Sequence, residues 1–236
     1  HHHFVLVHGL GLGAWSWCKI KPRLQSVGHK VTILDLAGSG IDTRTIEEIH
    51  KFSQYNEALM KIMASIPPSE KVILVGHSLG GMNIAFAMEM FPKIVSAAQL
   101  QLYPPDYLDT RFKPYGNPSE NLTSTLYGPK FLSTQLYQLS PVEELTLATT
   151  LVRPGSTFTT DLSKAMKFTK NGYGSVPKVC IVSAEDKAIA TKYQYWMIKK
   201  SGVKEVKVIP GADHMAMFSR PLQVAGFLLE VAAKYS

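Results

Sequence analysis

Cysteine, acidic residues and long apolar runs are all scarce in this sequence. The two cysteines, Cys18 and Cys180, are too few for a disulfide framework, and their spacing fits no metal site. No stretch approaches the roughly 18 consecutive apolar residues of a membrane-spanning helix, and no signal-peptide pattern precedes Phe4. We therefore expect a cytoplasmic protein with reduced cysteines, without a membrane segment and without a bound metal.

Charged residues are also few, at 18% of the 236 residues, whereas 45% are hydrophobic, a composition typical of a single globular domain. The formal net charge of +7 raises the question of nucleic acid binding. However, the basic residues are scattered, and Lys164, Lys167 and Lys170 recur at the spacing of one solvated helix face. With neither a basic block nor a recognised binding motif, we expect no nucleic acid partner.

Apolar runs alternate with amphipathic stretches over most of the chain. The predicted strands are 4–7, 30–36, 71–76, 94–102 and 178–186, and 205–214 is predicted to be a strand that leads into a loop. The predicted helices include 15–26, 46–66, 82–90, 193–201 and 221–235. This alternation predicts an α/β fold in which a mostly parallel sheet is covered by helices on both faces. Between 104 and 174 the rhythm is lost, so we interpret 104–174 as a cap inserted into one core made of 1–103 and 175–236.

A glycine-rich turn follows the first predicted strand, in VLVHGLGLGAW, and two chemistries use such a turn. Gly9, Gly11 and Ala14 match the spacing of a dinucleotide-binding fingerprint, and Asp35 ends the second strand, where a ribose-binding acid belongs. The same turn could instead lend a backbone N–H to an oxyanion hole. The turn alone does not decide between the two.

A second glycine motif is more informative. The segment LVGHSLGG contains G-x-S-x-G, with Ser78 between Gly76 and Gly80, directly after a predicted strand and before a helix. This is the context of a nucleophile elbow, in which a sharp turn projects the serine hydroxyl from the sheet. Side chains at the flanking positions would collide with neighbouring backbone, so glycine is expected at both. We interpret Ser78 as a nucleophile.

A serine nucleophile needs a base and an acid that orients the base, and this fold supplies them in the order serine, acid, histidine. Asp186 and His214 each follow a predicted strand at the carboxyl edge of the sheet, where Ser78 would also lie. Glu185 is an alternative acid, but neighbours in an extended segment point in opposite directions. Asp213 is expected to be a local turn or surface residue.

The remaining histidines have structural interpretations. We expect His8 to form a local hydrogen bond, and His29 and His50 to face solvent or cap helices. His77 could line the pocket beside the nucleophile or support it structurally.

If Ser78 is the nucleophile, the tetrahedral oxygen needs two backbone donors. One is the N–H of Leu79, and the other should come from the first glycine turn, at Leu10. The dinucleotide interpretation would leave Ser78, Asp186 and His214 unexplained, so we predict that the turn serves an oxyanion.

Several separate blocks resemble the plant methylesterase and hydroxynitrile lyase family of α/β-hydrolases. They are GAWSWCKIKPRLQSVGHKVTILDL, EKVILVGHSLGGMN, GPKFLSTQLYQLSPVEEL, LVRPGS and GADHMAMFSRP. The resemblance covers nearly the whole chain. It implies the family's triad for Ser78, Asp186 and His214, its oxyanion donors for Leu10 and Leu79, and no metal or organic cofactor. The implied substrate is a small carboxylic ester, such as the methyl ester of a plant hormone or an indole alkaloid.

Two positions separate esterases from lyases in this family. The similar lyases carry threonine where Gly9 stands and lysine where Met215 follows the histidine, and methionine cannot stabilise a departing cyanide. We therefore expect an esterase. A lyase and a hormone-binding protein that does not turn over are the alternatives. A homodimer is among the expected assembly states.

By the same resemblance, an acyl pocket is lined by Tyr107, Tyr127, Leu136, Thr157 and Met215, although these could equally be ordinary core residues of the cap. Similar salicylate-preferring proteins have tryptophan at the position of Tyr107 and leucine at that of Thr157. These differences imply a more polar cavity. The chain is also shorter than the family between Ala98 and Arg111, which indicates either an abbreviated cap or residues missing from the given sequence.

Overall fold

The computed structural model describes residues 1–99 and 106–235. Its main sheet has six parallel strands in the order β2-β1-β3-β4-β7-β8. The strands are β1 (His3–Val7), β2 (Lys30–Ile33), β3 (Val72–Gly76), β4 (Val95–Gln99), β7 (Lys178–Ser183) and β8 (Glu205–Ile209). All residues of β1, β3 and β7 are buried, as is typical of strands covered on both faces.

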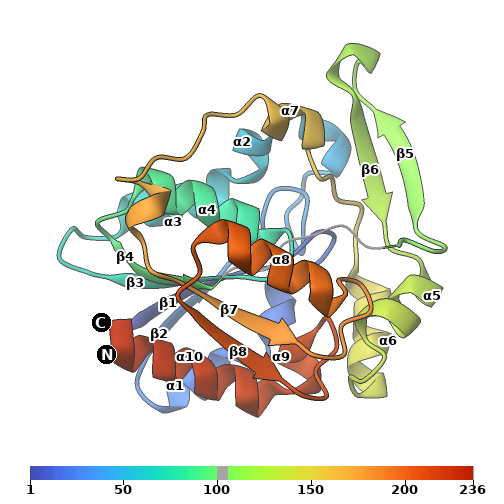
Figure 1. Cartoon of the computed structure of the whole chain (residues 1–236). Helices are drawn as coiled ribbons and strands as arrows, with labels where there is room; N and C mark the ends of the chain where they lie inside the picture. Colours follow the sequence, from blue (N-terminus) through green and yellow to red (C-terminus); the bar gives the residue numbers. More distant parts are fainter. Residues whose placement is uncertain (100–105, 236) are drawn as a thin grey trace.

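Alternate residues of β1 face two different hydrophobic layers. Phe4 and Leu6 pack into one hydrophobic layer, together with side chains of two helices near the ends of the chain. Val5 and Val7 pack into the other layer, together with side chains of the helices before and after β3. The first layer is covered by α1 (Lys21–Ser26) and α10 (Pro221–Tyr235), and the second by α3 (Glu57–Ser65) and α4 (Gly80–Met90). Figure 1 shows these two pairs of helices on opposite sides of the strands. The predicted α/β class is confirmed.

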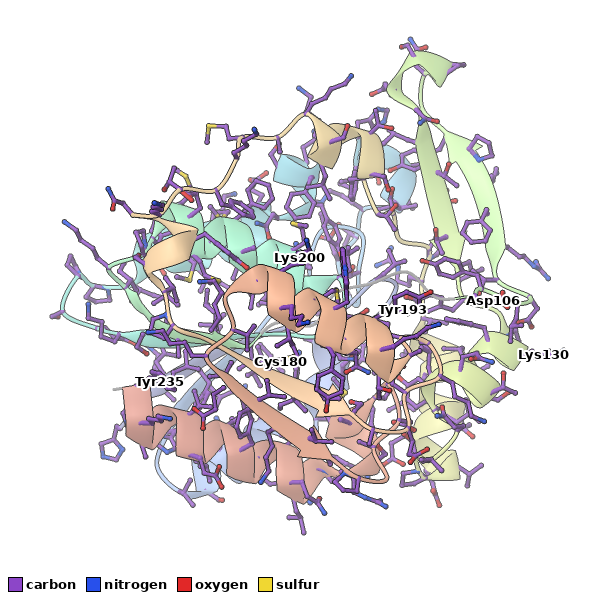
Figure 2. The ribbon with its side chains drawn as sticks, in the orientation of Figure 1. Asp106, Lys130, Cys180, Tyr193, Lys200 and Tyr235 are labelled. Carbon is purple, nitrogen blue, oxygen red and sulfur yellow. The ribbon has the colours of Figure 1, made fainter. Side chains whose placement is uncertain are left out.

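The segment between β4 and β7 contains a separate antiparallel hairpin, β5 (Arg111–Tyr115) and β6 (Leu122–Leu126). The hairpin projects from the body of the molecule in Figure 1. It is followed by three short helices, α5 (Pro129–Phe131), α6 (Val142–Leu151) and α7 (Thr159–Ser163). Figure 2 shows Asp106 and Lys130 close to the base of the hairpin, at the other side of the view from Tyr235 on α10. The expected start of the cap at 104 lies outside the described residues.

Several expected boundaries are wrong. The single helix expected over 46–66 is instead the 3-10 helix η2 (Ile46–Glu48), α2 (Phe52–Tyr55) and α3. The break between α2 and α3 lies at Asn56, whose side-chain amide donates to the backbone carbonyl of Asn83 on α4 and whose Oδ1 accepts from the Asn83 side chain. Over 205–214 the expected strand leading into a loop is present: β8 ends at Ile209, and Pro210 and Gly211, with φ of 72°, begin the loop with a turn. Part of the strand expected over 94–102 lies outside the described residues.

The remaining helices are short or close to the sheet edge. They are η1 (Ala14–Trp17), η3 (Pro118–Glu120), η4 (Leu132–Leu136), η5 (Tyr173–Ser175), α8 (Thr191–Ser201) and α9 (Ala216–Ser219). On α8, the buried Gln194 amide donates to the carbonyl of Ser183 and accepts from its N–H, which fixes the end of β7. Within 1–99 and 106–235, none of the helices has both the length and the apolar character needed to cross a bilayer.

Candidate active site

Ser78 occupies the turn between β3 and α4 in a backbone conformation that serine rarely adopts. Its φ is 53°, in the left-handed region, which costs about 1–2 kcal/mol for a residue with a side chain. Glycines on both sides permit the turn. A Cβ on Gly76 would lie 2.7 Å from the carbonyl oxygen of Gly80, and a Cβ on Gly80 would lie 2.6 Å from the carbonyl oxygens of Val7 and His8. The steric requirement expected for both glycines is therefore present.

Asp186 and His214, 28 residues apart, form a buried hydrogen-bonded pair. His214 Nδ1 and Asp186 Oδ2 lie 2.8 Å apart, and the Asp186 side chain is fully buried. The other carboxylate oxygen, Oδ1, accepts from the backbone N–H groups of Ala188 and Ile189 at 2.8 and 2.7 Å. These bonds fix the carboxylate, whereas neighbouring Glu185 is exposed.

This pairing determines the tautomer of His214. Because Nδ1 donates to a carboxylate, Nε2 of the neutral ring carries a lone pair and can accept a proton. Ser78 and His214 line the same cavity, of about 340 Å³. A strained serine, an imidazole with a free acceptor and a fixed carboxylate are the groups that an α/β-hydrolase site requires.

Asp213, expected to be a local turn or surface residue, is fully buried, so the surface position is wrong, while its bond to the N–H two residues on fits a local turn. Its Oδ2 accepts from the N–H of Leu139 at 3.0 Å and from the hydroxyl of Ser140 at 2.8 Å, and its Oδ1 accepts from the N–H of Met215. Asp213 therefore connects the loop that carries His214 to the turn before α6.

His77 supports the site without lining the main cavity. Its Nε2–H donates to the backbone carbonyl of His214 at 2.8 Å, and burial lowers the pKa of His77 to about 3, so the ring is neutral. The residue lines a separate cavity of about 20 Å³ with Trp17 and Ser183. Of the two interpretations of His77, structural support fits the geometry.

Leu10 and Leu79 both line the main cavity. In the described part of the chain, the backbone N–H of neither residue has a hydrogen-bond acceptor. Gly9 brings the first turn against the second, since a Cβ on Gly9 would lie 3.1 Å from the carbonyl oxygen of His77 and 3.2 Å from Ser78 Cβ. The two residues whose N–H groups are unused thus line the same cavity as Ser78.

Asp35, the acid of the rejected dinucleotide interpretation, has a structural role. Asp35 accepts from the N–H groups of Ala14 and Ile41, at 2.8 and 3.3 Å, and so fixes the loop after β1. The buried ring of His8 has the local role expected. Its Nε2 accepts from the N–H of Leu36, and its Nδ1–H donates to the carbonyl of Gly9. His50 bonds to Glu120 at the surface.

The main cavity includes four of the residues expected to form an acyl pocket: Tyr107, Tyr127, Leu136 and Thr157. Met215 is fully buried and does not line the cavity, because its side chain packs into the core beneath the loop. The sequence analysis missed six further lining residues: Met82, Phe131, Thr159, Leu162, Ala188 and Ile189. Met82, one helical turn after Ser78, and Ala188 and Ile189, just after Asp186, could have been found from their spacing. Thr159 and Leu162 carry no such signal.

In the described ranges, no three His, Cys, Asp or Glu side chains are grouped so that they could hold a metal ion. Cys18 is exposed, and burial raises the pKa of Cys180 in β7 to about 12. Neither thiol lies on the main cavity.

Known proteins share this fold and about half of this sequence. Residues 4–227 match the alpha/beta hydrolase family. Salicylic acid-binding protein 2 of Nicotiana tabacum is 51% identical over 99% of this chain and 98% of its own length. Methylesterase 1 of Arabidopsis thaliana is 47% identical over 99% of this chain and 97% of its own. The crystal structure of polyneuridine aldehyde esterase aligns with a TM-score of 0.94 at 44% identity, covering 98% of this chain and 99% of that one.

The chain therefore belongs to the plant methylesterase family of alpha/beta hydrolases. As expected from the sequence, it is a carboxylic ester hydrolase. The alignment with the tobacco protein runs over 255 positions, more than the 236 residues of this chain, so that protein has residues without a counterpart here. The expectation of a short segment between Ala98 and Arg111 includes 100–105, which lie outside the described residues.

Proposed function

We propose that the chain hydrolyses the methyl ester of a small plant hormone or indole alkaloid, with Ser78 as nucleophile, His214 as base and Asp186 as the orienting acid. The observation that carries this proposal is the Asp186–His214 hydrogen bond at the wall of the cavity that Ser78 also lines. The names of methylesterase 1 and polyneuridine aldehyde esterase support the choice of substrate class.

The reaction follows from the hydrogen bonds of the site. His214 Nε2 accepts the Ser78 proton as Ser78 Oγ attacks the ester carbonyl carbon, and the Asp186 carboxylate stabilises the imidazolium that forms. The N–H groups of Leu10 and Leu79 donate to the oxyanion. The tetrahedral intermediate then collapses: its C–O bond to the methoxy group breaks, His214 donates its proton to the methoxy oxygen, and methanol leaves behind an acyl-enzyme. Water, deprotonated by His214, attacks the acyl-enzyme, and the acid and free Ser78 are released.

Turnover of a panel of methyl esters tests this proposal. The panel is methyl salicylate, methyl jasmonate, methyl indole-acetate and an indole-alkaloid methyl ester, with the acid product measured. Ser78→Ala should abolish turnover, and the exposed Ser163→Ala on α7 is the matched control. Hydrolysis that persists in Ser78→Ala would overturn the assignment of the nucleophile.

The name of the tobacco relative favours one second candidate, a protein that binds a small acid. Such a protein would bind the acid tightly, and wild type and Ser78→Ala would then both fail to turn over the panel. Calorimetry with the four free acids separates this role from that of an enzyme whose substrate is outside the panel.

We further propose that 104–174 acts as a cap, and that the protein is a cytoplasmic homodimer. The role as a cap is supported by four residues of this segment that line the main cavity: Tyr107, Tyr127, Leu136 and Thr157. The edge strand β8 supports self-association, because its Val206 and Val208 are 38% and 42% exposed. Sedimentation of wild type and of Val206→Lys tests the dimer, which the lysine should dissociate.

A further inference from the structure

Apart from Ser78 and His214, the side chains that line the main cavity are apolar except for the hydroxyl groups of Tyr107, Tyr127, Thr157 and Thr159. Two of them, Thr157 Oγ1 and Thr159 Oγ1, lie 2.9 Å apart and form a hydrogen bond with each other. Each hydroxyl has one hydrogen and two acceptor positions, so the bonded pair keeps one hydrogen to donate and several positions to accept. Valine would have the same shape without this capacity.

The residue between the two threonines is held in a strained conformation. Phe158 has φ of 50°, although a bulky side chain disfavours the left-handed region. Its side chain is 2% exposed, and its ring centroid lies 5.4 Å from that of Tyr55 and 6.3 Å from that of Phe52. The core thus holds Phe158 on one side of the chain while both neighbouring threonines line the cavity.

Hydrogen bonds fix the segment on both sides of the threonines. Gly155 exchanges two backbone hydrogen bonds with Thr125 on β6, at 2.7 and 2.9 Å. Asp161 Oδ2 accepts from the N–H of Phe52 at 2.8 Å, which attaches α7 to α2, and Figure 1 shows the two helices side by side. Strain of this kind persists only where the surroundings determine the backbone. The hydroxyl pair is therefore pre-organised, which lowers the entropic cost of binding a ligand.

We propose that Thr157 and Thr159 form a subsite that hydrogen-bonds a neutral hydroxyl or carbonyl group on the acyl part of the ester. This inference rests on the function proposed above. Other side chains of 104–174 that line the cavity include Leu136, Leu162 and Phe131, and they favour an acyl group that is mostly apolar. Thr159 is exposed and Thr157 is half-buried. Among the described residues, no lysine, arginine, aspartate or glutamate lines the cavity, so a carboxylate at the threonine pair would find no lysine or arginine to pair with. The preferred substrate is a largely apolar methyl ester with one neutral polar group.

Matched pairs of esters test the subsite. We would compare the methyl esters of phenylacetic and phenylpropanoic acid with those of their para-hydroxy derivatives, which differ only in one distant hydroxyl. One of the two acyl chains should be long enough to bring the para-hydroxyl to the threonines. For that chain length, kcat/KM of the hydroxylated ester should be about three- to tenfold higher than that of the unsubstituted ester, as expected for one net hydrogen bond. The para-carboxy ester should be hydrolysed more slowly than either.

Thr157→Val and Thr159→Val should each lower kcat/KM for the hydroxylated ester more than for the unsubstituted ester, so that the preference disappears. Thr149→Val, an exposed threonine on α6, is the matched control and should keep the preference. A wild type that hydrolyses both esters equally, or valine variants that slow both equally, would overturn the subsite but not the proposed function. If no ester is turned over, the proposed function fails, and calorimetry of the same pairs with wild type and the valine variants still decides on the subsite.

Discussion

His77 and His214, 137 positions apart in the sequence, are joined by a hydrogen bond from His77 Nε2–H to the His214 backbone carbonyl, 2.8 Å long. The residue before the serine therefore holds the loop that carries the imidazole. Because both ends of this contact are buried, it fixes the distance between two turns that belong to different strands. The imidazole is thus oriented through its backbone as well as through Asp186.

Replacing His77 should lower the rate rather than substrate binding. His77→Leu removes the donor, and loss of one buried hydrogen bond of about 1.4 kcal/mol lowers kcat about tenfold if it acts on the position of His214. KM should change less than about twofold, because His77 does not line the cavity. His77→Gln, which keeps a donor, should recover part of the loss, and the surface variant His50→Leu is the control. Equal loss in His77→Gln and His77→Leu would contradict a positioning role.

Replacement of either glycine beside Ser78 by alanine should have the opposite effect on stability from the same replacement on α10. Gly76→Ala and Gly80→Ala place a Cβ within 2.7 Å of backbone atoms, and overpacking of this kind costs about 1–3 kcal/mol. Gly226→Ala on α10 meets nothing within 4 Å and should stabilise the helix by about 0.5–1 kcal/mol. Urea unfolding measures all three. A neutral Gly76→Ala or Gly80→Ala would show that the turn relaxes freely.

Gly9 makes a finer test, because the space around it is tight but not closed. A Cβ there would lie 3.2 Å from Ser78 Cβ and 3.3 Å from His77 Nδ1. Gly9→Ala should shift the turn by a few tenths of an ångström and lower kcat by a few fold, and Gly9→Thr should lower it by more than tenfold, since misplaced oxyanion donors are worth about 10² or more in kcat. Steady-state kinetics and melting temperatures on both variants separate this effect from unfolding. Full activity of Gly9→Thr would show that the close approach of the two turns is not needed.

The sequence predicted the centre of the sheet well because β1, β3 and β7 are short, fully buried and mainly apolar runs. The expected strand over 71–76 and β3 (Val72–Gly76) differ by one residue, and α10 (Pro221–Tyr235) has the expected bounds. Local signals were enough here, since burial on both faces leaves little choice of side chain.

The same signals failed where long-range contacts decide the structure. The β5–β6 hairpin was missed because Pro114 lies within β5, and proline argues against a strand unless it is at an edge. In the site, the spacing of Ser78, Asp186 and His214 follows a known order. The burial of Asp213, in contrast, depends on Leu139 and Ser140, more than 70 positions away. No local pattern carries that information.

Acidification should destabilise the fold through its buried histidines. Burial lowers the pKa of His77 to about 3 and also lowers the pKa of His8, whereas both histidines titrate near 6.5 when unfolded. Below that pH the unfolded chain binds more protons than the folded chain. The free energy of unfolding therefore decreases as the pH is lowered, by up to about 1.4 kcal/mol per pH unit for each histidine. The surface pair with Glu120 raises the pKa of His50 and so acts in the opposite direction.

Urea unfolding at about pH 7 and about pH 5 measures this slope, over a range where few carboxylates titrate. His77→Gln should reduce the slope, and His50→Gln should not. Stability that is constant or rises between the two conditions would contradict the prediction.

Asp213 should be needed for stability although it does not touch the cavity. Asp213→Ala leaves the N–H groups of Leu139 and Met215 and the Ser140 hydroxyl without their acceptor in a buried region. Unpaired buried donors of this kind make a loss of about 2–4 kcal/mol the expected result. Ser140→Ala removes one donor and keeps the acceptor, so its cost should be only about 1 kcal/mol. If chemical denaturation gave the same small loss for both variants, the loop that carries His214 would be held by its own packing. The loss of unfolding free energy in Asp213→Ala, relative to that in Ser140→Ala, therefore measures how strongly the hydrogen bonds of Asp213 hold the His214 loop to the turn before α6.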